Sequence, residues 1–179
     1  ILGRTDADIV LLGLISWHYR YQRPQQLSAA LGRRRKRVIY VEPAFLPGTA
    51  PQPYRLEENP ADNVFCATLR VPGPIDINRA PPTAAQVPVL AGGLLALSDA
   101  LVLDNPTLIL QAPFWLPVCR SLPRARLVYD SMDLYGSFQN VTADVVELEK
   151  DLFRSADLVV FTAAALQERT RPPRSEVIR

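Results

Sequence analysis

The sequence predicts an α/β fold, a doubly wound and mostly parallel Rossmann-like sheet. Five short apolar runs recur along the 179 residues, each too short for a helix and rich in consecutive Val, Ile or Leu, as in strands covered on both faces. They are Ile9–Ile15, Val38–Val41, Leu108–Leu110, Leu127–Tyr129 and Leu158–Phe161. Helical patterns separate most of these runs, and strands that alternate with helices form parallel sheets with right-handed crossovers.

The first helix is predicted between the first two strands. Pro24 suits the first helical turn, and Leu27, Ala30 and Leu31 follow at helical spacing before Gly32, which is expected to end the helix. In a sixth apolar run, Val64–Val71, every second residue is apolar, whereas the residues between them include Thr68 and Arg70. This alternation is expected of an edge strand.

Three further helices are predicted downstream. Val87–Leu103 is the most apolar stretch, but Gly and Asp interrupt it and it is shorter than the ~20 residues of a membrane span, which favours a helix packed on the domain. Thr142 is a plausible N-cap for Ala143–Ser155, in which Val145, Leu148 and Leu152 form one stripe. A short helix over Ala163–Thr170 is stopped by the prolines that follow.

The composition is that of a globular domain with rigid loops. The chain is 48% hydrophobic and 21% charged, with a net charge of +2, which argues against a dedicated nucleic-acid binder. Prolines number 17, about twice the usual ~5% share. They concentrate in two predicted long loops, Pro43–Pro60 and Pro72–Pro88, and loops of that length are usually functional or mobile.

Several classes of site are disfavoured. The chain has two cysteines, Cys66 and Cys119, without C-x-x-C spacing, and one histidine, which argues against a disulfide scaffold and a zinc site. Ile1–Asp8 shows no signal peptide, so a cytoplasmic protein is expected. The sequence also lacks G-x-G-x-x-G, the P-loop motif and G-x-S-x-G, the marks of NAD enzymes, P-loop NTPases and α/β-hydrolases.

A ligand site is expected where the strands end, because open parallel sheets bind ligands outside the carboxyl ends of their strands. Aromatic rings beside carboxylates and amides suit a carbohydrate, which has an apolar face and many hydroxyls. For the two tryptophans, capping of the core is the alternative. The candidates at this rim are Trp17, His18, Arg23, Glu42, Gln111, Trp115, Asp130 and Asp133.

Several of these stretches resemble the start of bacterial glycosyltransferases of the GT-B fold, in the family 4-like group. Trp17–Leu27 (WHYRYQRPQQL) and Arg37–Pro43 (RVIYVEP) are similar to that group's "W…QRPQ-x-L" and "RV-x-YVEP" segments. Further similar segments are Tyr129–Asp133 (YDSMD), Leu148–Leu152 (LEKDL) and Ala156–Val160 (ADLVV). Together these matches run from Ile9 to Leu166 in the family's order.

The resemblance implies that residues 1–179 are the N-terminal, acceptor-side Rossmann-like domain of a two-lobe enzyme. The C-terminal lobe that binds the nucleotide sugar would then lie outside this chain, and the fragment alone would be inactive. The implied function moves a sugar from a nucleotide-sugar donor to a saccharide or lipid-linked acceptor in cell-surface polysaccharide or glycolipid synthesis, with no further cofactor. The alternatives are a non-catalytic sugar- or nucleotide-binding module, and an epimerase or phosphorylase on the same scaffold.

The resemblance also suggests roles for single residues. Asp133 is the first candidate for the base of an inverting enzyme and Asp130 the second, with loop capping as the alternative for each. In a retaining enzyme Asp133 would instead position the acceptor. His18 is a candidate acceptor contact. Arg23, at a helix start, could meet a phosphate or pair with Glu42, which could itself bind a hydroxyl.

A run of five basic residues follows the first predicted helix. Such a run is usually a solvated turn, but it could dock weakly on an anionic membrane and hold the protein at the inner face. The run is Arg33, Arg34, Arg35, Lys36 and Arg37.

Overall fold

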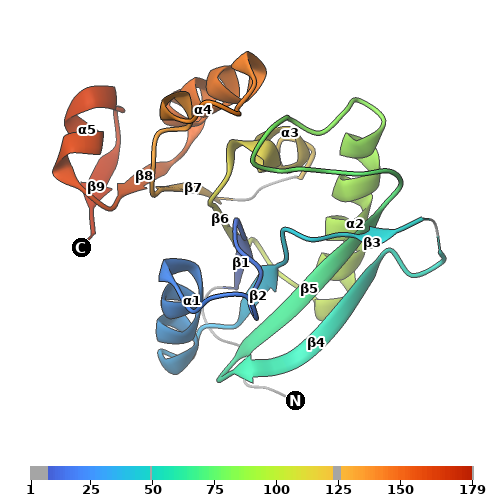
Figure 1. Cartoon of the computed structure of the whole chain (residues 1–179). Helices are drawn as coiled ribbons and strands as arrows, with labels where there is room; N and C mark the ends of the chain where they lie inside the picture. The colour runs from blue at the N-terminus through green and yellow to red at the C-terminus, as the bar shows by residue number, and fades with distance from the viewer. Residues whose placement is uncertain (1–7, 49, 123–125, 179) are drawn as a thin grey trace.

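A nine-stranded sheet with helices on both faces forms the described part of the chain, which in this computed structural model comprises residues 8–48, 50–122 and 126–178 (Figure 1). Every strand pair is parallel except β4 with β5. The predicted α/β, mostly parallel Rossmann-like fold is confirmed. The absence of a signal peptide was predicted on the first eight residues, of which all but Asp8 lie outside the described residues.

All five predicted core strands are present in the sheet. Its strands are β1 (Ile9–Leu12), β2 (Val38–Val41), β3 (Leu46–Pro47), β4 (Tyr54–Ala61), β5 (Val64–Val71), β6 (Thr107–Leu110), β7 (Arg126–Ser131), β8 (Leu158–Phe161) and β9 (Ser175–Val177). The strand order is β3-β5-β2-β1-β6-β7-β8-β9, with β4 beside β5. The chain therefore builds outward from β1 in one direction and then from β6 in the other, and a topological switch point lies between β1 and β6.

The helices cover the two faces unequally. They are α1 (Arg23–Arg33), α2 (Gln86–Leu101), α3 (Leu116–Cys119), α4 (Ala143–Ser155) and α5 (Ala164–Thr170), with 3₁₀ turns η1 (Pro113–Trp115) and η2 (Tyr135–Ser137). Residues of α2, α3, α4 and α5 pack in one large core cluster, whereas α1 packs with a smaller cluster on the opposite face (Figure 1). Along β1 the side chains alternate between the clusters, Val10 and Leu12 in the larger and Ile9 and Leu11 in the smaller. The strand is thus buried on both faces, as its apolar run predicted.

The predicted helices are present with small shifts. α4 has the predicted bounds, α5 begins one residue later than predicted, and α2 packs its buried face, including Leu90, Leu94 and Leu97, into the larger core. None of the helices in the described residues is long and apolar enough to span a lipid bilayer.

Two predictions about β5 and the preceding loop are wrong. β5 is not an edge strand, because β2 and β4 pair with it on opposite sides, and β3 pairs with its last residues. The Pro43–Pro60 loop therefore contains β3 and most of β4, and the register of β4 shifts between Glu58 and Ala61, around Pro60. Arg70, a polar residue of this run, contributes to the pairing of β5 with β3, because its Nη1 donates to the carbonyl of Pro47 at 2.7 Å.

Gly32 does not end the first helix, which continues to Arg33. Gly32 is buried inside α1, and a Cβ atom added there would lie 2.0 Å from the backbone oxygen of Asp62. Asp62 belongs to the turn between β4 and β5, whose Asn63 donates to the Gly32 carbonyl at 3.0 Å. Gly32 is therefore required for the close approach of this turn to the helix.

We expect Gly32→Ala to lower the free energy of unfolding by about 3 kcal/mol, because the turn or the helix must move to admit the methyl group. Gly92, an exposed glycine within α2, is the matched control because a Cβ there meets nothing within 4 Å. Gly92→Ala should raise the free energy by about 0.5–1 kcal/mol through helix propensity. Urea unfolding followed by circular dichroism measures both, and equal stabilities of the two variants would contradict the packing argument.

Candidate functional site

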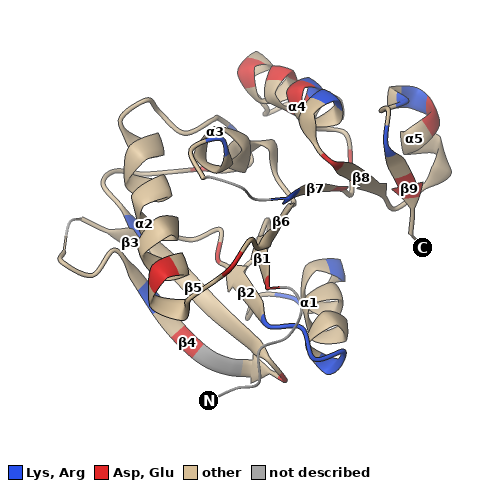
Figure 2. Cartoon of the chain, turned by 180° about the vertical axis from the view of Figure 1, so that it is seen from behind, with Lys and Arg blue, Asp and Glu red and all other residues tan. Residues whose placement is uncertain are grey.

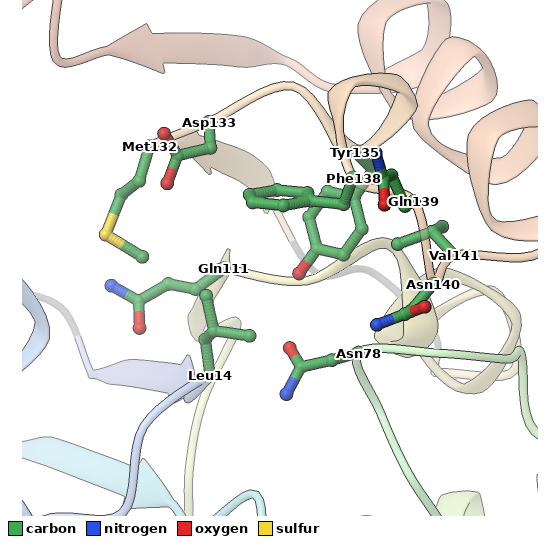
Figure 3. A pocket seen from close by; sticks show the side chains of 10 residues that line it. All are labelled: Leu14, Asn78, Gln111, Met132, Asp133, Tyr135, Phe138, Gln139, Asn140 and Val141. Carbon is green, nitrogen blue, oxygen red and sulfur yellow. The ribbon is translucent and has the colours of Figure 1, made fainter.

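A cavity of about 300 Å³ lies beside the switch point of the sheet. Its wall combines residues that follow β1, β6 and β7, namely Leu14, Gln111 and Met132. It is completed by the loop after β7 and by the loop before α2 (Figure 3). The lining residues are Leu14, Asn78, Gln111, Met132, Asp133, Tyr135, Phe138, Gln139, Asn140 and Val141. This is where a parallel sheet is expected to bind a ligand.

The lining is apolar and amide-rich. It includes four amide side chains and one carboxylate, that of Asp133, and no Lys, Arg or His contributes to it. The Phe138 ring and the Tyr135 ring stand over the cavity, with their centroids 6.1 Å apart in an edge-on arrangement. Such a wall fits a small, uncharged, partly apolar molecule that offers hydroxyls.

Asp133 is exposed on the rim of this cavity. Figure 3 shows its carboxylate on the same side of the cavity as Met132. Nothing in this geometry tests whether it removes a proton, so its role as a base stays a prediction.

Asp130, in contrast, is buried in an ion pair. Its side chain is 2% exposed, and it accepts hydrogen bonds from Arg23 Nη2 at 2.9 Å and from Gln111 Nε2 at 3.1 Å. Arg23 Nε donates to the same carboxylate at 3.1 Å. Asp130 therefore joins the start of α1 to the ends of β6 and β7. Its role as a second candidate base stays a prediction.

The predicted ion pair between Arg23 and Glu42 is wrong. Arg23 pairs with Asp130, while both carboxylate oxygens of Glu42 accept from the Trp17 backbone N–H, at 3.1 and 3.3 Å. Burial raises the pKa of Glu42 above its ordinary value of 4.5, partly offset by hydrogen bonds from Trp17 and Ser16. Glu42 thus holds the loop after β1 in place, and like Arg23 it does not line the cavity.

The other rim candidates do not line the cavity either. Trp115 is 0% exposed, and its Nε1 donates to the Gly13 carbonyl at 3.2 Å. Trp17 is 8% exposed and packs edge-on against Tyr40. Both tryptophans therefore belong to the core, as the alternative reading had it, and they offer no free ring face for a sugar. His18 is exposed, with Nε2 3.2 Å from Glu57.

The sequence reasoning missed Glu149, which supports the cavity wall from behind. It is 4% exposed, and it accepts from the Tyr129 hydroxyl at 2.9 Å and from the Tyr135 backbone N–H at 3.1 Å. Tyr135 begins η2, so Glu149 holds the turn that carries Tyr135 and that Phe138 directly follows. A signal for this burial was available, since Glu149 lies four residues after Val145 and three before Leu152, on the buried stripe of α4.

Eight of the ten lining residues were not among the predicted candidates. Tyr135 and Phe138 follow Asp133 by two and five residues, so extending the strand-end rule a little further along the loop would have found them. Asn78 has no local signal, because its loop reaches the cavity only through the packing of the whole domain.

The pH dependence of stability should reflect the burial of Glu149. Desolvation raises the pKa of Glu149 above its ordinary value of 4.5, although the hydrogen bonds from Tyr135, Tyr129 and Gly136 oppose this. A carboxyl whose pKa is higher folded than unfolded stabilises the fold fully below pH 4.5, and this contribution is lost as pH rises through the folded-state value.

We therefore expect Glu149→Gln to remove part of this pH dependence. Relative to wild type, the variant should gain stability as the pH is raised from about 4.5 to about 8, because the amide cannot ionise. Urea unfolding across that range measures the change, with Glu147→Gln on the exposed face of the same helix as control. Parallel curves for wild type and Glu149→Gln would contradict the assignment.

The basic run lies at the C-terminal end of α1 and in the turn before β2 (Figure 2), and none of its residues lines the cavity. Arg33, Arg34 and Arg35 are exposed. Arg37 is not part of a free basic patch, because it pairs with Asp8 at 2.6 Å and donates to the Leu101 carbonyl at 2.9 Å. Contact of the exposed arginines with an anionic membrane stays a prediction. Among the described residues, no group of three or more His, Cys, Asp or Glu side chains could hold a metal ion.

Comparison with known proteins adds evidence on the fold. No protein-family profile matches the chain, and no curated protein matches it. Among solved structures, the chain is similar to sucrose-phosphate synthase from Thermosynechococcus elongatus, with a TM-score of 0.61 and 15% sequence identity over 96% of this chain and 87% of that chain. The chain thus has the Rossmann-like fold of a GT-B lobe. At this identity the likeness shows the fold alone, and membership of the family 4-like group stays a prediction.

Proposed function

We propose that this chain is the acceptor-side lobe of a glycosyltransferase that moves a sugar from a nucleotide-sugar donor to a saccharide or lipid-linked acceptor. The observation that carries the proposal is the cavity at the switch point, with its apolar and amide wall and one exposed carboxylate, Asp133, on its rim. The fold shared with sucrose-phosphate synthase supports it.

In the proposed reaction an acceptor hydroxyl lies in the cavity near Asp133. Its oxygen attacks the anomeric carbon of the donor sugar, Asp133 takes the hydroxyl proton, and the bond from that carbon to the diphosphate oxygen breaks. The nucleoside diphosphate leaves with the electron pair of that bond. In a retaining enzyme Asp133 would instead hold the acceptor by a hydrogen bond.

The diphosphate would have to be bound by another part of the enzyme. The cavity lining contains no cation, and Arg23, the cation at the start of α1, is already paired with Asp130. The charge that develops on the leaving group requires cationic or backbone N–H donors. This supports the proposal that a second, donor-binding lobe completes the active site.

The competing proposal is a non-catalytic sugar-binding module, which the same cavity would serve. The test is to incubate the complete natural gene product with a panel of nucleotide sugars and saccharide acceptors, and to detect the glycosylated product by mass spectrometry. Transfer to an acceptor supports the proposal. Sugar binding without transfer for any donor would instead favour the binding module.

A further inference from the structure

We infer that the molecule bound in this cavity is an uncharged sugar ring, held by the side-chain oxygen of Gln111 and the hydroxyl of Tyr135, and that a phosphorylated sugar is excluded. The identification of the ring as the acceptor rests on the proposed function. The class of ligand rests on the cavity itself, as follows.

Gln111 presents a hydrogen-bond acceptor to the cavity. The residue is 2% exposed and its Nε2 donates to Asp130 at 3.1 Å. Because a carboxylate only accepts, this bond determines which end of the amide faces Asp130. Oε1 is then left buried, with no hydrogen-bond partner among the described residues. A buried acceptor without a partner is unfavourable, so a ligand that donates an O–H to it is stabilised.

Tyr135 presents the second buried polar atom. The residue is 5% exposed, and its hydroxyl oxygen likewise has no partner in the described part of the chain. Burial raises the pKa of Tyr135, so the hydroxyl keeps its proton and can both donate and accept. Figure 3 shows this hydroxyl and the Asn78 side chain directed toward the same space, and the Gln111 amide on the side of the cavity where Met132 lies.

The remaining wall suits the apolar face of a sugar. The Phe138 ring is 51% exposed at the opening, and Leu14, Met132 and Val141 supply aliphatic surface. A volume of about 300 Å³ is at the lower end of the usual range for ligand sites, which fits a single ring. Aromatic and aliphatic surface opposite directed polar groups is the arrangement that a sugar ring complements.

The charges around the cavity disfavour a phosphate. Of the ten lining residues, Asp133 alone is charged, and it is an anion. Arg79 follows Asn78 in the chain but is not among the lining residues. A phosphate group placed here would lose its hydration without gaining a cation and would be repelled by Asp133.

The experiment titrates the chain with methyl hexopyranosides and with the corresponding hexose 6-phosphates, followed by saturation-transfer NMR. Methyl glycosides should bind, and the phosphates should bind at least tenfold more weakly. Tyr135→Phe should weaken glycoside binding about fivefold without lowering thermal stability, because the hydroxyl it removes has no partner in the protein. Tyr19→Phe, an exposed tyrosine outside the cavity, is the matched control.

A gain of function tests the charge argument directly. Asn140 is an exposed lining residue, and Asn140→Lys adds a cation that should admit the hexose 6-phosphate. Octyl glycosides tested beside methyl glycosides separate a lipid-linked sugar from a free one, since tighter octyl binding indicates a site that also contacts the lipid chain.

The outcomes separate this inference from the proposed function. Tighter binding of the phosphates to wild type would overturn the inference and leave sugar transfer untouched. Transfer by the complete gene product without glycoside binding in this cavity would also overturn it. Glycoside binding that is weakened by Tyr135→Phe supports the inference. If such binding is found but no donor gives transfer, only the identification of the bound sugar as the acceptor is contradicted.

Discussion

Asp133→Asn is expected to lower the rate of sugar transfer by the complete gene product by about 10²–10⁴-fold, the usual contribution of a general base. The amide has nearly the same shape as the carboxylate but cannot accept the hydroxyl proton. Because Asp133 is exposed on the cavity rim, the substitution should leave the fold unchanged. Release of nucleoside diphosphate in the presence of acceptor measures the rate.

The control for Asp133→Asn is Asp144→Asn, an exposed acid in the first turn of α4 that does not line the cavity. Its rate should match wild type. A transfer rate of the Asp133→Asn variant equal to that of wild type would contradict the assignment of Asp133 as the base. A raised KM with kcat nearly unchanged would instead assign Asp133 to acceptor positioning, as expected for a retaining enzyme.

Arg23→Met is expected to lower the free energy of unfolding by about 3 kcal/mol, toward the low end of the range for breaking a buried ion pair. The variant leaves the Asp130 carboxylate buried at 2% exposure, with the Gln111 amide as its remaining side-chain donor. The low end applies because the Arg23 side chain is itself 25% exposed. Urea unfolding measures the loss.

Two further variants show whether the unpaired charge causes that loss. Arg20→Met removes an exposed cation from the loop that precedes α1 and should change stability by less than about 0.5 kcal/mol. Arg23→Met combined with Asp130→Asn removes both charges and should recover part of the stability. A single variant Arg23→Met as stable as wild type would show that the pair contributes nothing.

Much of the strand and helix pattern could be predicted because it depends on local periodicity. β1, β2 and β8 bury every position or nearly so, and each appears in the sequence as a short continuous apolar run. α4 has the predicted bounds because Thr142 precedes an amphipathic stripe. Each of these signals lies within a dozen neighbouring residues, where side-chain spacing alone indicates the element.

The errors arose where a residue acts through a distant partner. Val64–Val71 alternates like an edge strand, yet β4 covers its outer side. Glycine commonly ends helices, but Gly32 lies inside α1 and allows the close approach of the turn at Asp62. Asp130 follows a strand like a capping acid, but it is neutralised by Arg23, 107 residues away. No local pattern carries these pairings.

The sequence predicted a region of the sheet in which a cavity does lie, but it did not predict most of the residues that line this cavity. The strand-end rule led to Gln111 and Asp133, both of which line the cavity, and also to Trp17 and Trp115, which fill the core instead. The position of a residue at a strand end places its backbone at the rim of the sheet. Whether its side chain turns inward to the core or outward to a ligand depends on the packing around it.

By itself, the sequence determined the α/β class and most of the strands and helices, because hydrophobic periodicity is a local property. It also predicted that a ligand binds at the carboxyl ends of the strands. The tertiary structure alone decided the order of the strands, the partners of the buried charges and the shape of the cavity. These depend on contacts between residues far apart in the chain, such as Asn78, Gln111 and Tyr135 around one space. Within the described residues, the buried side-chain oxygens of Gln111 and Tyr135 have no hydrogen-bond partner, a property that depends on the packing of the whole domain.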